Sequence, residues 1–239
     1  MRPEKEDRFL EIGPGPGALT LRLAPRVAHL TAVEIDPGMI AALGPRVPAN
    51  VTLVQGDFLE FDTPGLVRAG PLRVAGNLPY NVSSPILFKL LRDHKATGGI
   101  RDATLMVQRE VADRIAASPG TRDYGVLAIL VHVHADVRRV LTLPPGAFRP
   151  APRVHSAVVN LAFRAPAVSF QDEAVLERLV RSMFTQRRKT LLNAVRPFAQ
   201  SRGGDSRRAL EAAGLDASRR PETLTLAEIA RLSDALSSP

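Results

Sequence analysis

The stretch Asn77-Leu78-Pro79-Tyr80 is suited to holding a flat ring that carries an amine. It follows an apolar run that ends at Gly76. The Asn77 side-chain oxygen and the Leu78 carbonyl are two acceptors, which can hold the two hydrogens of an exocyclic amine such as N6 of adenine. Pro79 fixes its own φ and biases Leu78 towards an extended shape, and Tyr80 offers a face for base stacking. The segment therefore predicts a clamp for an aromatic amine, and the alternative is an ordinary turn with a buried tyrosine.

A second set of residues predicts a pocket for adenosine. The glycine-rich segment EIGPGPG (11–17) follows an apolar run, and glycines let a ligand approach the backbone closely. Glu34 lies 21 residues after Gly13, at the end of the next apolar run, where an acidic side chain accepts hydrogen bonds from ribose hydroxyls. Asp57 ends the third run. NAD and S-adenosylmethionine (SAM) both contain adenosine, and the amine clamp favours SAM, because hydride transfer has no need of it.

These residues require a sheet whose strand ends meet at one edge. The sequence predicts strands over 8–13, 30–36, 51–57, 71–77, 103–108, 137–143 and 156–163, and helices over 17–27, 37–43, 83–93, 109–118 and 123–134. Ser84 is the predicted N-cap of the third helix, with Pro85 in its first turn. The alternation indicates an α/β fold with a mostly parallel sheet. The last two strands have no helix between them, which predicts an antiparallel edge strand.

From Gln171 onward the pattern is helix after helix, with expected breaks at Pro197, Gly203-Gly204, Gly214 and Pro221. We therefore predict a catalytic domain over 1–167 and a small all-helical domain over 168–239.

Charge and composition narrow the class of protein. The 239 residues contain no cysteine, which excludes disulfides, a thiolate nucleophile and cysteine-ligated zinc, and fits a cytoplasmic protein. The five histidines show no metal-ligand spacing, and no apolar run is long enough for a membrane span or a signal peptide. Residues 1–91 are neutral, so the net charge of +8 lies entirely in residues 92–239. This asymmetry suggests a polyanion-binding half, and the alternative is a charged surface that only contacts solvent.

Six segments, in order, resemble the ribosomal RNA adenine N6,N6-dimethyltransferases, most of all the bacterial small-subunit members: FLEIGPGPGALT, VEID, GNLPYNVSSPI, QREVADRI, GAFRPAPRVHSAV and FTQRRKTLLNAV. The resemblance covers nearly the whole chain. It implies a Rossmann-like class I methyltransferase sheet with a helical RNA-binding domain, and SAM as cofactor. It also implies dimethylation of two adjacent adenines near the 3′ end of small-subunit (16S) rRNA, within a 30S assembly intermediate, by a monomer.

The same resemblance assigns residues to roles. The candidate catalytic residues are Asn77, Leu78, Pro79, Tyr80 and Phe148, and the candidate cofactor-binding residues are Gly13, Gly15, Glu34, Ile35, Asp57, Phe58 and Asn77. Arg187, Arg188 and Lys189 match a segment close to RNA, and their alternative is a helix face exposed to solvent. We expect direct in-line methyl transfer, without a metal or a covalent enzyme intermediate.

Two departures from the family pattern stand out. Family members carry a further N-terminal segment with a QNFL-type motif that closes over the cofactor, whereas this sequence begins directly at the first strand. His155 stands where the family usually has aspartate, and it receives no role.

The sequence and the resemblance leave three functions open. They are a small-subunit rRNA dimethyltransferase, a large-subunit (23S) rRNA methyltransferase of the erythromycin-resistance type, and a non-catalytic ribosome-assembly or nucleic-acid-binding factor on the same fold. An NAD dehydrogenase is disfavoured, because no acid/base for hydride transfer stands beside the pocket.

Overall fold

The computed structural model describes residues 1–149 and 151–237. The chain divides into two compact units, which we call the sheet unit (Met1–Ala112 with Asp136–Arg164) and the helical unit (Asp113–Ala135 with the described residues from Ala165 onward). The structure thus groups residues 113–135 with the C-terminal helices, a grouping that the sequence pattern did not suggest. The assignment of a catalytic role to one domain and RNA binding to the other stays a prediction.

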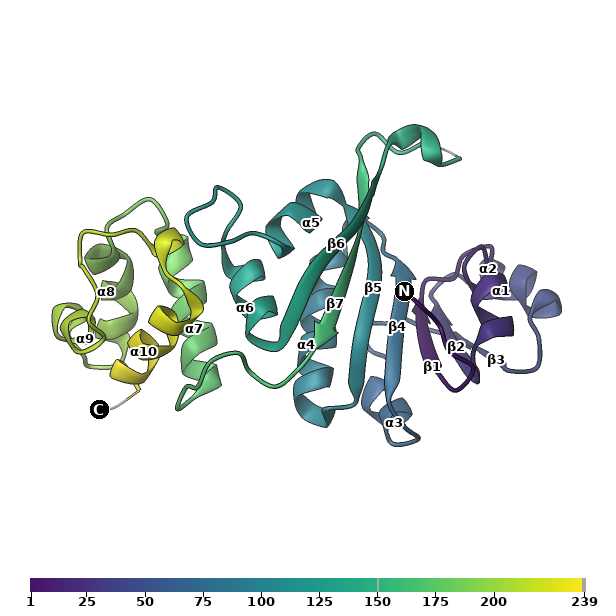
Figure 1. The fold of residues 1–239 in the computed structure, drawn as a ribbon, viewed down its shortest axis with the longest axis horizontal. Helices are drawn as coiled ribbons and strands as arrows, with labels where there is room; N and C mark the ends of the chain where they lie inside the picture. The colour runs from purple at the N-terminus through teal and green to yellow at the C-terminus, as the bar shows by residue number, and fades with distance from the viewer. Residues whose placement is uncertain (150, 238–239) are drawn as a thin grey trace. The chain divides into compact units, whose positions relative to one another are not determined.

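The sheet unit contains a seven-stranded sheet in the order β3-β2-β1-β4-β5-β7-β6 (Figure 1). Neighbouring pairs among β1 to β5 are parallel, and β7 pairs with β5 in the antiparallel direction. The predicted mixed sheet is therefore confirmed. The strand bounds are β1 Arg8–Ile12, β2 His29–Glu34, β3 Val51–Gln55, β4 Leu72–Asn77, β5 Ile100–Gln108, β6 Ala135–Leu143 and β7 Ser156–Phe163.

The strand register brings the candidate residues to one edge of the sheet. Strands β1, β2 and β4 are almost entirely buried, as expected for central strands of a parallel sheet covered on both faces. Ile12 stands opposite Val33 on one side and Gly76 on the other. The segments that follow β1, β2 and β4 therefore begin side by side, and these are the segments that the sequence analysis singled out.

Arg73 anchors the start of β4, the strand that ends in Asn77. Its guanidinium is buried, donates hydrogen bonds to Asp7 at 2.6 Å and Asp102 at 2.8 Å, and lies 5.0 Å from the centroid of the Phe9 ring. Burial by itself would raise the pKa of Asp7, but the hydrogen bonds from the Glu4 backbone and Arg73 lower it overall. The strand that carries the clamp is thus held at its start by a guanidinium that is bonded to two carboxylates.

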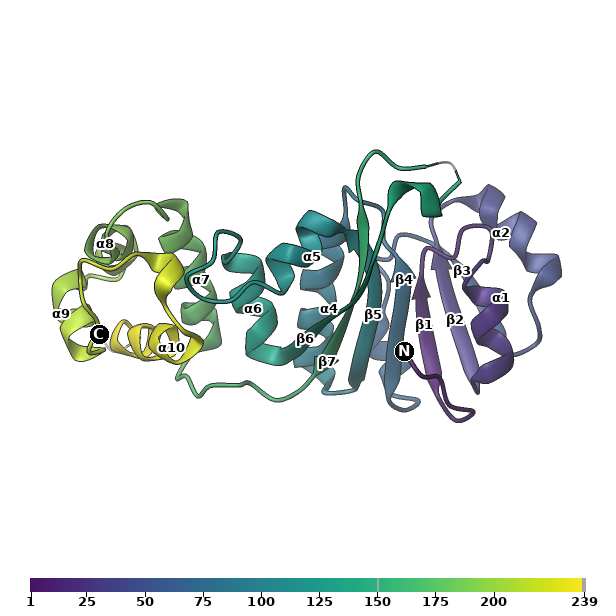
Figure 2. The ribbon, with the colours of Figure 1, turned by 45° about the horizontal axis from the view of Figure 1, so that its top comes forward.

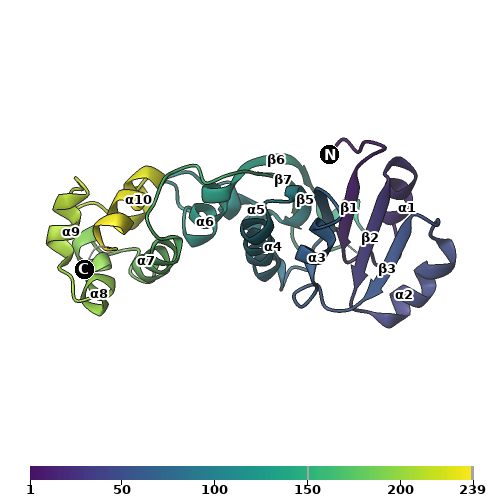
Figure 3. The ribbon, with the colours of Figure 1, turned by 90° about the horizontal axis from the view of Figure 1, so that it is seen from below.

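Five helices follow the strands of the sheet unit or connect them, and α3 and α4 lie on the same side of the strands (Figure 3). Their bounds are α1 Thr20–Leu23, α2 Pro37–Leu43, α3 Thr63–Val67, α4 Ser83–Thr97 and α5 Arg109–Ile115, the last of which spans the division between the units. The α3 helix was not predicted, and the helix predicted over 17–27 is only α1 followed by a 3₁₀ turn.

The predicted N-cap of α4 is wrong. The helix begins at Ser83, with Val82 as the N-cap, and Ser84 lies inside the first turn. The Ser83 hydroxyl donates to the Pro79 carbonyl at 3.0 Å. This hydrogen bond connects the clamp with the first turn of α4. Pro85 lies in the first turn, as predicted.

The connection between β6 and β7 extends beyond the ends of the neighbouring strands (Figures 1 and 2). It begins with the 3₁₀ turn Pro145–Ala147, and Phe148 follows in extended conformation.

The helical unit consists of α6 Val126–His134, α7 Glu173–Thr185, α8 Leu191–Ser201, α9 Ser206–Ala212 and α10 Leu226–Ala235. Asp172 and Asp205 accept backbone hydrogen bonds as N-caps of α7 and α9, and Thr225 forms a capping box with Glu228 at α10. The expected break at Pro197 is wrong, because Pro197 lies inside α8. That helix buries a continuous apolar face, whose packing outweighs the one hydrogen bond that proline removes.

None of the helices in the described residues is both long enough and apolar enough to cross a membrane.

Candidate active site

The glycine-rich segment after β1 forms a loop held against β2. Gly13 and Gly15 have φ values of 63° and 52°, a left-handed conformation in which a side chain would be strained. The Gly13 N–H donates to the Val33 carbonyl at 3.0 Å. The loop therefore presents bare backbone to the space beside it.

Glu34 ends β2 and fixes this loop. Its Oε2 accepts a hydrogen bond from the Gly15 N–H at 2.9 Å, and its Oε1 accepts one from the Asp36 N–H at 3.1 Å. The residue is 8% exposed. The carboxylate thus lies next to the glycine loop, as the sequence suggested, although in this structure it binds the loop itself.

Three further predicted cofactor residues lie after β2 and β3. Ile35 is 66% exposed, and Phe58 is buried with the Lys89 ammonium 5.3 Å from its ring centroid. Asp57 lies two residues beyond the end of β3 and accepts a hydrogen bond from the Leu59 N–H at 2.8 Å. Their contact with a cofactor stays a prediction.

A cavity of about 510 Å³ opens beside the glycine loop. Its wall is formed by two predicted cofactor-binding residues of the loop, by the end of β4 and by one aromatic ring of the β6–β7 connection. Its lining includes Gly13, Gly15, Gly76, Asn77, Thr104, Met106, Phe148 and Glu11. Glu34, Ile35, Asp57 and Phe58 are not part of that lining.

Glu11 is a functional candidate that the sequence analysis missed. It is 2% exposed, and its Oε2 atom has no hydrogen-bond partner among the described residues. Burial, with a smaller contribution from the nearby Glu34 carboxylate, raises the pKa of Glu11 from the usual 4.5 to about 7. An acidic residue inside the otherwise apolar run FLEIG (9–13) was the signal that would have found it.

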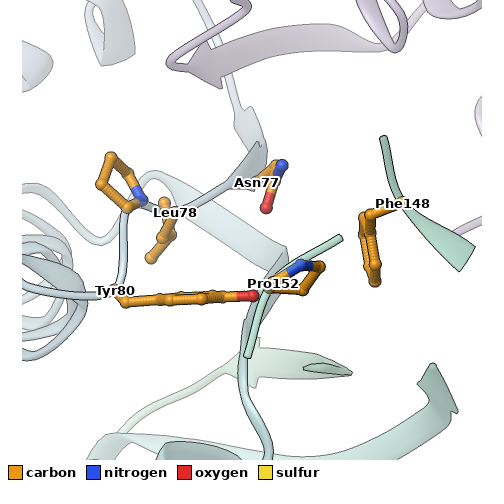
Figure 4. Close-up of a pocket in the computed structure, with 6 residues that line it drawn as sticks. Asn77, Leu78, Tyr80, Phe148 and Pro152 are labelled. Atoms are coloured by element: carbon orange, nitrogen blue, oxygen red, sulfur yellow. The ribbon is translucent and has the colours of Figure 1, made fainter. Parts of the chain in front are cut away.

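A second cavity, of about 330 Å³, lies at the end of β4 (Figure 4). Its lining consists of Asn77, Leu78, Pro79, Tyr80, Phe148 and Pro152. All five predicted catalytic residues therefore line one cavity, although Phe148 and the clamp are far apart in the sequence. The close-up shows the Asn77 amide and the Tyr80 and Phe148 rings around the same space.

The backbone of the clamp is fixed by the sheet. Leu78 is 1% exposed, and its N–H donates to the Met106 carbonyl of β5 at 3.0 Å. A Cβ atom on Gly76 would lie 2.9 Å from the Ile12 carbonyl oxygen, so only glycine fits before Asn77. Asn77 itself is exposed, and its side-chain amide makes no hydrogen bond within the part of the chain that the structure describes. Its donor and acceptor groups are therefore available to a ligand.

The two cavities adjoin, because Asn77 and Phe148 line both of them. A ligand in the glycine-lined cavity and a ring in the second cavity would meet at the Asn77 side chain. This arrangement is suited to a transfer between two bound molecules.

The predicted RNA-binding residues belong to the turn between α7 and α8 rather than to a helix face. Arg187 donates to the Thr121 carbonyl at 3.3 Å and lies 3.8 Å from a carboxylate oxygen of Glu222. Arg188 and Lys189 are exposed. Arg187 thus has structural partners within the helical unit, and the other two have side chains open to solvent.

His155 is exposed, and its carbonyl accepts a hydrogen bond from the Arg109 N–H at 2.9 Å. Within residues 1–149 and 151–237, no group of three histidine or acidic side chains is placed to hold a metal ion.

Comparison with known proteins matches this geometry to a family. The family model for ribosomal RNA adenine dimethylase matches residues 1–236. A protein from Pseudomonas fluorescens named ribosomal RNA small subunit methyltransferase A is 47% identical, with 97% of this chain and 84% of the relative covered. A protein of the same name from Geobacter metallireducens is 43% identical, with 99% and 86% covered.

Two solved structures are similar over almost their whole length. A dimethyladenosine transferase from Plasmodium falciparum has a TM-score of 0.80 at 26% identity, with 96% of this chain and 90% of that chain covered. The 23S rRNA methyltransferase ErmE has a TM-score of 0.69 at 26% identity, with 99% and 93% covered. The Rossmann-like sheet, the adjoining cavities and the match over nearly every residue agree, and the chain belongs to the ribosomal RNA adenine dimethylase family of methyltransferases.

Proposed function

We propose that this chain transfers methyl groups from SAM to the N6 amines of two adjacent adenines near the 3′ end of small-subunit (16S) rRNA. The observation that carries the proposal is the pair of adjoining cavities that share Asn77 and Phe148. One has a glycine-lined wall suited to a nucleoside cofactor. The other has amine acceptors and aromatic rings suited to a base.

The residues of the glycine-lined cavity fit SAM. Gly13 and Gly15 let the cofactor approach the backbone, and Glu34, which lies outside the lining and accepts the Gly15 N–H, would offer ribose hydroxyls a charged acceptor. The unpartnered oxygen of Glu11 is suited to a positively charged ligand, and SAM carries both a sulfonium and an ammonium group. When bound, SAM supplies an electrophilic methyl group.

The clamp orients the target amine. The Asn77 side-chain oxygen and the Leu78 carbonyl accept the two amine hydrogens, which favours a pyramidal nitrogen whose lone pair faces the cofactor cavity. The Tyr80 and Phe148 rings stack against the faces of the base. Alignment of this kind contributes roughly 7–11 kcal/mol in favourable cases. No strong base is required, because the methylated nitrogen is acidic and loses its proton to water.

The basic half of the chain supports RNA as the substrate. Residues 92–239 carry the whole net charge of +8, and the exposed side chains of Arg188 and Lys189 can contact phosphates. We assign Arg187 a smaller part, since it already has partners within the helical unit. We further propose that the enzyme acts as a cytoplasmic monomer on a 30S assembly intermediate, which sedimentation of the free and bound protein would test.

The large-subunit alternative is supported by the similarity to ErmE, at 26% identity. The small-subunit methyltransferases are 43–47% identical over nearly the whole chain, which favours the first assignment. A non-catalytic assembly factor would need neither the glycine-lined cavity nor the free amide of Asn77.

The test is incubation with labelled SAM and either undermethylated 30S subunits or 23S rRNA, followed by mapping of the modified bases. We expect label on two adjacent adenines of the 30S subunit, and none with the variant Asn77→Ala. Label only on 23S rRNA would support the alternative. Binding of SAM and RNA without transfer would support the assembly factor.

A further inference from the structure

The Tyr80 ring is attached to a strand that lies far from it in the sequence. The Tyr80 phenol oxygen lies 3.0 Å from the Ser156 hydroxyl oxygen, across a separation of 76 residues. In the view of Figure 4 the ring is seen edge-on, and its hydroxyl end points towards the segment that carries Pro152. This hydrogen bond connects the clamp at the end of β4 with the strand that follows the β6–β7 connection.

Ser156 is a rigid partner. It is 1% exposed, it is the first residue of β7, and it stands opposite Gln108 in the antiparallel ladder with β5. The preceding carbonyl, that of His155, accepts the Arg109 N–H at 2.9 Å. The serine backbone is thus held against the end of β5 and the start of α5, and its buried hydroxyl is carried by this fixed backbone.

Tyr80, by contrast, lies in a short turn. It follows Pro79 and precedes α4, and it is only half-buried. A tyrosine in such a turn has two side-chain torsions that packing alone restricts weakly. A hydrogen bond at the far end of the ring restricts both torsions together, because it fixes the phenol oxygen relative to the sheet.

We propose that Ser156 is a positioning residue, whose hydroxyl holds the Tyr80 ring in the orientation that stacks the target adenine. The inference rests on the proposed function and deepens it, since it concerns the base-binding side of the same site. Ser156 does not line the cavity and need not touch the base. It acts through Tyr80. Ser156 begins β7, and Phe148 lies in the connection that precedes this strand, so the positions of both aromatic rings of the cavity depend on β7 and its preceding connection.

A double-mutant cycle tests the coupling. The variants are Ser156→Ala, Tyr80→Phe and the combination of both, each assayed in a single turnover on undermethylated 30S subunits at saturating SAM. A net hydrogen bond of ordinary strength predicts that each single variant slows methyl transfer about threefold to tenfold. The double variant should be no slower than the slower single variant, because both substitutions remove the same bond. RNA affinity should change little.

A stacking measurement gives a second readout without methyl transfer. In an RNA whose target adenine is replaced by 2-aminopurine, fluorescence quenching on binding reports the stacked ring. Ser156→Ala should reduce the quenching, and it should not reduce it further in the Tyr80→Phe background. Ser233→Ala is the matched control, since Ser233 is also fully buried, belongs to α10 and has an unpartnered hydroxyl.

Two results would overturn the inference. One is a folded Ser156→Ala enzyme with wild-type transfer rate and wild-type quenching. The other is a double variant whose loss is the product of the two single losses, which would show that the side chains act independently. If the wild-type protein itself transfers no methyl group to adenine, the proposed function fails instead, and the two failures are therefore distinguishable.

Discussion

The substitution Glu11→Gln should reveal a carboxyl group that folding keeps protonated up to about pH 7. In the folded chain burial raises the pKa of Glu11 from 4.5 to about 7. Below pH 4.5 the group is protonated in both the folded and the unfolded state, and the stability is unaffected. Between these two values the unfolded chain loses the proton while the folded chain keeps it, so the stability falls as the pH rises. Above about pH 7 the group is ionised in both states, and the stability no longer falls with pH.

The expected size follows from the same values. The difference between 4.5 and about 7 corresponds to about 3 kcal/mol, at about 1.36 kcal/mol for each pH unit. Glutamine has a similar shape and does not titrate. The stability of the Glu11→Gln variant, relative to wild type, should therefore increase between pH 4.5 and 7 by up to about 3 kcal/mol and then level off.

The assay is denaturant unfolding of the cofactor-free protein in steps from pH 4 to 8, with Glu60→Gln as the control at an exposed position. Because Glu34 contributes to the raised pKa, the rise should be smaller and should level off at a lower pH in a Glu34→Gln background. A difference between Glu11→Gln and wild type that is flat across this pH range would refute the reasoning. It would mean that folding does not raise the pKa of the Glu11 carboxyl group.

Three further substitutions test the site and the RNA contacts. Glu34→Ala should weaken SAM binding by roughly 1.5–3 kcal/mol, because ribose hydroxyls lose a charged acceptor, and calorimetry would measure the change. Asn77→Ala and Tyr80→Ala should each slow single-turnover methyl transfer far more than they weaken RNA binding, with SAM affinity reduced only by the first, since Asn77 also lines the cofactor cavity. Arg188→Ala and Lys189→Ala should each reduce the salt dependence of RNA binding by a slope of roughly 0.7–0.9, as measured by titrations at several salt concentrations.

Each of these predictions has a contradicting result. Unchanged SAM affinity in folded Glu34→Ala would remove Glu34 from the cofactor site. A folded Asn77→Ala enzyme that methylates at the wild-type rate would show that residues 77–80 are only a turn. An unchanged salt slope in Arg188→Ala would place the RNA surface elsewhere.

Most of the sheet could be predicted from the sequence, because buried strands of a parallel sheet are short apolar runs bounded by glycine, proline and acidic residues. Errors arose where tertiary packing outweighed a local signal. Pro197 reads as a helix break, yet α8 continues through it because its apolar face is buried. Ser84 reads as an N-cap, yet the N-cap is Val82, two residues earlier, and the neighbouring Ser83 hydroxyl donates to the Pro79 carbonyl.

The candidate site was predictable where its residues follow strand ends. Gly13, Gly15 and Asn77 line the glycine-lined cavity because parallel strands place their carboxyl ends at one edge. Glu34 ends β2, and its contact with a cofactor stays a prediction; its hydrogen bond to the Gly15 N–H could not be foreseen from spacing alone. Arg187 was grouped with its neighbours as an RNA contact, because a run of basic residues does not show which of them already has a partner.

The sequence by itself determined the succession of the seven strands, the glycine-rich loop, the rigid Asn-Leu-Pro-Tyr turn and the family resemblance, because these depend on residues that are neighbours in the chain. Only the tertiary structure decided that Phe148 reaches both cavities, that Glu11 is buried with an unpartnered oxygen, and that Tyr80 is held by Ser156. These contacts join residues from different strands. They depend on the strand order and register, which bring distant segments within bonding distance and decide which side chains are removed from water.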